Sequence, residues 1–151
     1  AMTSKVQLGT GAWNIQFFVR LAATPDTDIY CLVVQETSTT LCIILEGGTG
    51  NLQIQTDSAL TTFSTTTSVG ISSWQHIEVS KDGSGIIRGF IEGALLGTTV
   101  TDSNNFGSAG LANIYFGYDD FVNPMKYDEL RIVKGSAVHT ASFTPPTTEL
   151  S

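Results

Sequence analysis

The sequence predicts an all-β protein in which two antiparallel sheets pack face to face. Alternating and β-branched apolar runs recur about every ten residues, with glycine or polar turns between them. Charged residues, which dominate the surfaces of helices, make up only 14% of the chain, and no segment shows helical periodicity beyond a turn. The runs are too numerous for one open sheet, so a sandwich is the economical arrangement.

Turn signals separate the expected strands along the chain. "WNIQFFVRLAA" is the first strand, and the apolar runs "DIYCLVVQE" and "TLCIILE" follow it. "GGTG" at 47–50 leads into "NLQIQT", while "DGSG" at 82–85 and Gly93 delimit the strands after "SWQHIEVSK". Because glycine supplies the positive φ angles of tight hairpins, neighbouring strands should be antiparallel. The expected strands span residues 13–23, 28–36, 40–46, 51–56, 73–81, 85–92, 94–100, 111–118 and 125–133.

Length and charge restrict the partners of the chain. Its 151 residues suit one domain, and its formal charge of −7 opposes nucleic acid, whose affinity for proteins comes from clustered Lys and Arg. The longest apolar stretches, at 29–34 and 41–45, are far shorter than the ~20 residues that span a bilayer. We therefore expect neither nucleic-acid binding nor membrane insertion. Cys31 and Cys42 lie inside apolar runs, so we expect them to be buried and reduced.

Three stretches, taken in order, carry a resemblance to a known family. They are "WNIQFFVRL" (13–21), "SWQHIEVSKDGSGIIRGFIEGALLG" (73–97) and "YDELRIVKGSAVHTASFTPP" (127–146). They resemble the laminin G-like jelly-roll domains of the concanavalin A-like lectin and glucanase superfamily, of the type found in tailed-phage tail proteins and bacterial surface proteins. The resemblance implies one jelly-roll domain over residues 5–151. Residues 1–4 are expected to be a cloning remnant and an N-terminal tail.

The resemblance also implies a function. It predicts a non-catalytic module that binds a cell-surface glycan, polysaccharide or receptor, on a virion surface or outside the cell. The other expected partners are neighbouring subunits of a phage tail fibre or spike, in which the chain would form a homotrimer. A structural or assembly module of a virion or surface protein, without a sugar ligand, is the alternative. No cofactor is implied, and the chain departs from the family at Val138-His139, where members often carry Arg-Tyr.

Glycoside hydrolysis is the catalytic activity to weigh, because some members of the superfamily cleave β-glucans. Retaining hydrolysis needs two carboxyl groups about 5 Å apart. Asp128 and Glu129 are neighbours in an expected strand and so point to opposite faces, and the Glu-x-Asp-x-Glu pattern of those enzymes is absent from the sequence. Strict alternation places Asp128 with Leu130 and Ile132 on the inner face. It therefore predicts a partly buried carboxylate that acts as a structural anchor.

The loop at 117–124 is the first candidate for a ligand site. It brings Asp119, Asp120 and Asn123 together with Tyr118 and Phe121 between two expected strands. Carboxylate and amide oxygens hold sugar hydroxyls or Ca²⁺, and an aromatic ring stacks on a sugar. Any Ca²⁺ would have Asp119 and Asp120 as ligands. The alternative is a solvated turn in which Phe121 folds back as a lid.

Trp74 and His76 form the second candidate site. Both lie at the start of an expected strand, on the face opposite Ile77, where they would present an aromatic platform to a sugar ring. The alternative is ordinary packing within the strand.

Overall fold

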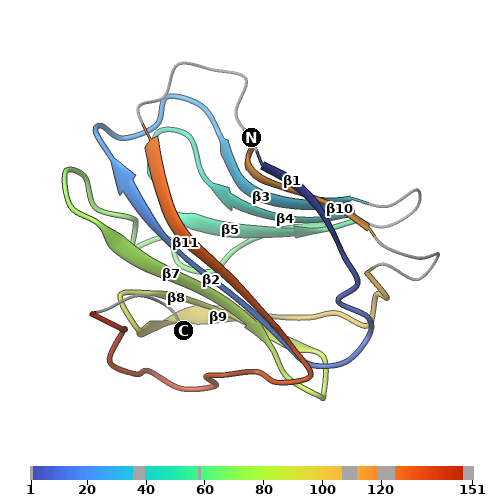
Figure 1. Cartoon of the computed structure of the whole chain (residues 1–151). Helices are drawn as coiled ribbons and strands as arrows, with labels where there is room; N and C mark the ends of the chain where they lie inside the picture. The colour runs from blue at the N-terminus through green and yellow to red at the C-terminus, as the bar shows by residue number, and fades with distance from the viewer. Residues whose placement is uncertain (1, 36–39, 58, 107–111, 119–124, 148–151) are drawn as a thin grey trace.

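The computed structural model describes residues 2–35, 40–57, 59–106, 112–118 and 125–147. These residues form eleven strands, which are β1 (Met2–Val6), β2 (Trp13–Leu21), β3 (Ile29–Gln35), β4 (Thr40–Leu45), β5 (Leu52–Thr56), β6 (Ala59–Thr62), β7 (Gln75–Lys81), β8 (Ile86–Ile91), β9 (Ala94–Thr101), β10 (Ala112–Tyr118) and β11 (Met125–Lys134). One sheet has six strands in the order β1-β10-β3-β4-β5-β6, and the other has five in the order β11-β2-β7-β8-β9. The two sheets face each other (Figure 1). Every pair of neighbouring strands is antiparallel, which confirms the predicted all-β sandwich.

Two observed strands have no counterpart among the expected ones. β1 pairs with β10 and β6 pairs with β5, so they form the two edges of the six-stranded sheet. Edge strands are often short and only partly covered, and they carry weak sequence patterns. Residues 2–4, which the sequence analysis assigns to an N-terminal tail, belong to β1.

The hydrophobic core lies between the sheets and follows from side-chain alternation. In β2, Trp13, Ile15 and Phe17 point inward and are completely buried. Leu41 and Ile43 of β4 enter the same cluster from the opposite sheet. Burying a large apolar side chain contributes ~1.5–3 kcal/mol, so this layer holds the two sheets together.

A β-bulge in β11 breaks the alternation that the sequence suggests. Asp128 pairs with Phe18, and Arg131 pairs with Gln16, so two residues of β11 stand opposite one residue of β2. Glu129, inside the bulge, has a φ of 53°. Such a bulge reverses the faces to which later residues of the strand point.

The bulge corrects the prediction for Asp128. Met125 and Tyr127 pack against the core before the bulge, and Leu130 and Ile132 pack against it afterwards. Asp128 therefore faces away from the core and is exposed, so the predicted partly buried anchor is wrong. Counting in twos from Leu130 failed because the strand contains one extra residue.

The C-terminal tail, residues 135–147, folds back over the outer face of the five-stranded sheet. It leaves β11 at Gly135, whose N–H donates to the carbonyl oxygen of Ala12 at 2.8 Å. Phe143 donates its backbone N–H to the carbonyl oxygen of Gly93 at 2.9 Å, and its ring contacts the ring of Phe90. Figure 1 shows this segment in red. Phe143 thus packs the tail against the sandwich.

Candidate functional site

The tail covers a polar network on the outer face of the five-stranded sheet. Glu78 of β7 is completely buried. Its Oε2 lies 2.8 Å from Nδ1 of His139, and its Oε1 accepts a hydrogen bond of 2.6 Å from Nδ2 of Asn14. Burial raises the pKa of the Glu78 carboxyl, and the His139 and Asn14 contacts oppose that shift. Because both carboxylate oxygens of Glu78 contact other side chains of the protein, Glu78 holds the tail against the sheet.

His76 is also sealed beneath the tail. Its ring is completely buried and meets the ring of Phe18 at 5.2 Å and that of Phe143 at 5.8 Å, both edge to face. Burial lowers the pKa of His76 to about 4, so the imidazole is neutral at pH 7. Trp74 keeps 42% of its surface exposed. The predicted platform of Trp74 with His76 is therefore wrong, because only the tryptophan reaches the surface.

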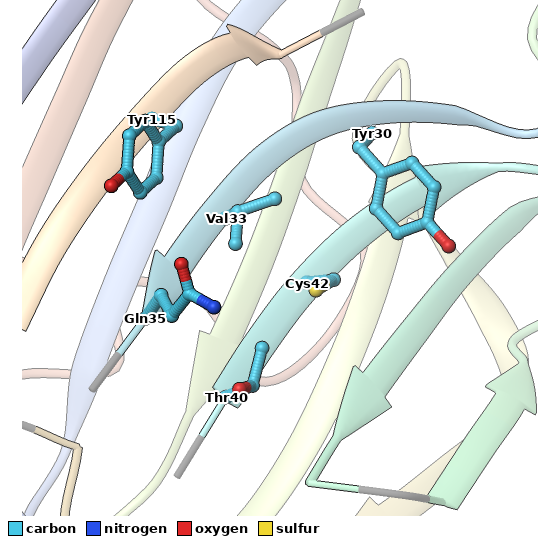
Figure 2. A pocket seen from close by; sticks show the side chains of 6 residues that line it. All are labelled: Tyr30, Val33, Gln35, Thr40, Cys42 and Tyr115. Atoms are coloured by element: carbon cyan, nitrogen blue, oxygen red, sulfur yellow. The ribbon is translucent and has the colours of Figure 1, made fainter. Parts of the chain in front are cut away.

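The outer face of the six-stranded sheet carries a hollow of about 310 Å³. We call it the tyrosine groove. Figure 2 shows that β10, β3 and β4 all contribute side chains to it. Its lining residues are Tyr30, Val33, Gln35, Thr40, Cys42 and Tyr115.

Strand register explains how these residues meet. Tyr115 pairs with Val33, which pairs with Cys42, so the three side chains form one row across β10, β3 and β4. Gln35 and Thr40 pair in the next row of the same face. Tyr30 lies three residues before Val33, which places the two tyrosines roughly 10 Å apart along the strand direction. The groove thus has an aromatic ring at each end and an apolar floor (Figure 2).

A second irregularity places Tyr30 in the groove. The pairing of β3 with β4 shifts register between Tyr30 and Leu32. Cys31 and Leu32 are consequently both part of the inner core, whereas Tyr30 and Val33 pack together outside it. Regular alternation would point residues 30 and 33 to opposite faces. Alternation along β3 therefore gives no indication of this groove.

The groove offers hydrogen bonds and apolar contacts without charge. Its polar groups are the tyrosine hydroxyls, the Gln35 amide and the Thr40 hydroxyl. Burial raises the pKa of the Cys42 thiol to about 11, so it stays protonated at neutral pH. Cys31 and Cys42 are both buried thiols that form no disulfide with each other, as predicted. The described lining therefore contains no carboxylate or imidazole for acid–base chemistry.

The first predicted site falls mostly outside the described residues. Asp119, Asp120, Phe121 and Asn123 belong to the range 119–124, which the structure does not describe. Tyr118 is the last residue of β10 and pairs with Tyr30 of β3. The predicted loop therefore begins directly after the residue that pairs with Tyr30, which lies at one end of the groove.

The described ranges contain no group of three or more His, Cys, Asp or Glu residues placed to hold a metal ion. They also contain no helix that is long and apolar enough to cross a membrane.

Comparison with known proteins supports the fold. No family model matches the chain, and no curated protein matches it. Domain 4 of AbnA, an extracellular GH43 arabinanase from Geobacillus stearothermophilus solved with arabinotriose, aligns with a TM-score of 0.67 and 18% identity, over 87% of this chain and 63% of that one. Galectin LEC-6 from Caenorhabditis elegans aligns with a TM-score of 0.59 and 11% identity, over 87% and 89%.

The binding domain of botulinum neurotoxin serotype D aligns with a TM-score of 0.60 and 13% identity, over 82% of this chain and 33% of that one. This chain therefore spans less than two thirds of the arabinanase and toxin chains. At these identities the likeness shows the fold alone. The protein has a jelly-roll β-sandwich fold.

Proposed function

We propose that this chain is a non-catalytic module that binds an uncharged part of a glycan or surface receptor through the tyrosine groove. One observation carries the proposal: the tail occupies the outer face of one sheet, while the outer face of the other has, among the described residues, a hollow between Tyr30 and Tyr115. Ligand sites are concave, mostly apolar, and contain a few placed polar groups. The groove meets this description.

The chemistry of the lining favours a sugar. The flat ring of a tyrosine provides an apolar surface against which the C–H groups of a sugar ring pack, and its hydroxyl is a polar group that can donate or accept a hydrogen bond. Gln35 and Thr40, in the neighbouring row, supply amide and hydroxyl groups that match sugar hydroxyls. The similar arabinanase domain was solved with arabinotriose, which makes a neutral oligosaccharide a sensible first probe.

The loop at 119–124 completes the proposed binding region. Because the chain reaches it from Tyr118, opposite Tyr30, we propose that Asp119, Asp120 and Asn123 contact the same ligand. Ca²⁺ held by the two aspartates is part of this proposal. We place the module, as a laminin G-like domain, in a phage tail fibre, spike or comparable extracellular assembly. Its partners there would be a host glycan and neighbouring subunits, with a homotrimer as the expected state.

Calorimetric titration with a panel of neutral oligosaccharides that includes arabinotriose tests the groove. We expect Tyr30→Ala and Tyr115→Ala each to weaken binding about tenfold, because each removes one stacking surface. Trp74→Ala removes a partly exposed aromatic residue from the other sheet and should leave this affinity unchanged. Equal affinities in all four proteins would show that the groove is not the site.

Titration of the double variant Asp119→Ala with Asp120→Ala, with and without Ca²⁺, tests the loop separately. We expect weaker glycan binding and, for the wild type only, a dependence on Ca²⁺. An assay for β-glucan hydrolysis tests the non-catalytic assignment, for which we expect no turnover.

The alternative, an assembly module without a sugar ligand, has one observation in its favour. Leu60, on edge strand β6 of the same sheet, is 53% exposed. An apolar side chain on an unpaired strand edge suits contact with another subunit. Light scattering that shows a stable trimer, together with no binding in the glycan panel, would favour this alternative.

A further inference from the structure

A second groove lies on the five-stranded sheet, at the end of β2 and the start of β11. Its volume is about 390 Å³, and Arg20, Ala22, Ser72, Met125 and Lys126 line it. Arg20 and Lys126 are both exposed. No residue of this groove lines the tyrosine groove, so the two hollows are separate.

The two cations of this groove stand directly opposite each other. Lys126 of β11 pairs with Arg20 of β2. Like charges at directly opposed positions of neighbouring strands destabilise a sheet. The placement is unexpected in a chain that has only seven Lys and Arg against fourteen Asp and Glu. Neither side chain forms an ion pair within the described part of the chain, and the neighbouring Asp128 on the same face forms none there either. An anion between the cations would turn this repulsion into attraction.

Arg20 is held in a defined position. Its Nε donates a hydrogen bond to the carbonyl oxygen of Ser72 at 3.2 Å. The backbone N–H of Ser72 in turn donates to the carbonyl oxygen of Leu21 at 2.6 Å, which ties the segment before β7 to the end of β2. With Nε engaged, the terminal nitrogens of the guanidinium remain as a fork for two oxygens of a carboxylate.

Two exposed apolar side chains lie near the end of β2, where Arg20 stands, although neither lines the groove. Ile71 bridges to Leu21 and is 52% exposed. Trp74 directly precedes Gln75, the pairing partner of Val19, so it too lies near the end of β2. A large exposed aromatic next to a pair of cations provides both a stacking surface and a charge contact. A sugar acid has the matching features, because it joins a carboxylate to a ring with apolar C–H faces.

We propose that this groove binds an acidic oligosaccharide, with a carboxylate between Arg20 and Lys126 and a sugar ring against Trp74. The site adds a charge-selective contact to a glycan-binding module, but it is independent of the tyrosine groove. Of the two grooves, this is the one that positively charged side chains line.

Calorimetric titration with tri-galacturonic acid and with its neutral methyl ester tests the proposal. The wild type should bind the acid and lose most of this binding for the ester and at high salt, because exposed charge contacts are screened. The double variant Arg20→Gln with Lys126→Gln should weaken binding about tenfold or more. Lys134→Gln removes an exposed charge from the other end of β11 and should have no effect. Thermal melting of the unliganded double variant should show equal or higher stability, since the repulsion is gone.

Three results would overturn the proposal: equal binding of acid and ester, equal binding by wild type and double variant, or equal loss in Lys134→Gln. Polyglutamate that binds as well as the sugar acid, with no effect of Trp74→Ala, would contradict the sugar assignment and indicate an acidic peptide. Variants at Tyr30 and Tyr115 should not change binding of the acid. Failure here is therefore distinguishable from failure of the neutral-glycan function.

Discussion

His76 predicts a specific loss of stability at acidic pH. Its folded pKa is lowered to about 4 from 6.5, mainly by burial, while the unfolded chain keeps the ordinary value. As the pH falls below about 6.5, the imidazole becomes protonated in the unfolded state but stays neutral in the folded state until the pH approaches the lowered pKa. The resulting loss of folding free energy is about 2 kcal/mol at about pH 5 and about 3 kcal/mol at about pH 4.

Glu78 has the opposite sign and must be separated from His76. Its folded pKa is raised, so its contribution is present at low pH and is lost as the pH rises through the raised folded value. Comparing the wild type with His76→Phe cancels this term, because Glu78 remains in both proteins. Phenylalanine suits the site, since the rings of Phe18 and Phe143 surround it and neither imidazole nitrogen has a hydrogen-bond partner among the described residues.

Urea unfolding, followed by tryptophan fluorescence at about pH 7.5, 6 and 5, measures the effect. The difference in unfolding free energy between the variant and the wild type should grow by about 2 kcal/mol in favour of the variant over this range. Near-ultraviolet circular dichroism verifies that the variant keeps its native packing. Parallel pH profiles for the two proteins would refute the reasoning, because the buried imidazole would then not control acid stability.

Three further predictions concern close packing and thiol reactivity. Gly93→Ala should release the tail, because Gly93 has a φ of 72° and a methyl group there would collide with the carbonyl oxygen of Phe143. We expect faster protease cleavage within residues 135–147, and an unchanged cleavage rate would contradict this prediction. Gly89→Ala should lower the unfolding free energy by about 1–3 kcal/mol, since the Cβ of the new alanine would lie 2.5 Å from the Phe63 ring. An unchanged stability in urea would mean that the ring moves aside. Cys42 is 4% exposed and its thiol has a pKa of about 11. It should therefore react with a thiol reagent far more slowly in the folded protein than in urea, and equal reaction rates would refute its burial.

Regular alternation explains how much of the fold could be predicted. Every expected strand range overlaps an observed strand, because the runs are alternating or continuously apolar, rich in β-branched residues, and bounded by turn signals. The strands that were missed, β1 and β6, lie at sheet edges, where burial imposes little pattern. The resemblance added the jelly-roll connectivity, which composition and periodicity do not contain.

The misplacement of Asp128 and the omission of Tyr30 share one physical cause. A bulge at Glu129 turned Asp128 outward, and the register shift between Tyr30 and Leu32 turned Tyr30 toward Val33. A bulge requires no special residue, so the sequence gives little warning of it. Each of these irregularities reverses the face of every residue beyond it. The candidate site could therefore not be assembled by counting along strands.

The C-terminal tail covers a polar cluster on the outer face of the five-stranded sheet. Asn14, Gln16 and Glu78 form a polar cluster on the outer face of the five-stranded sheet, and on an uncovered sheet such a cluster would suit sugar hydroxyls. His139 occupies it instead, stacked on Phe143 at a centroid distance of 3.5 Å. The chain thus uses its own polar face to fasten its end. Two hollows of the described residues lie outside this covered cluster: the uncharged groove on the other sheet and the cationic groove at the rim of the covered one.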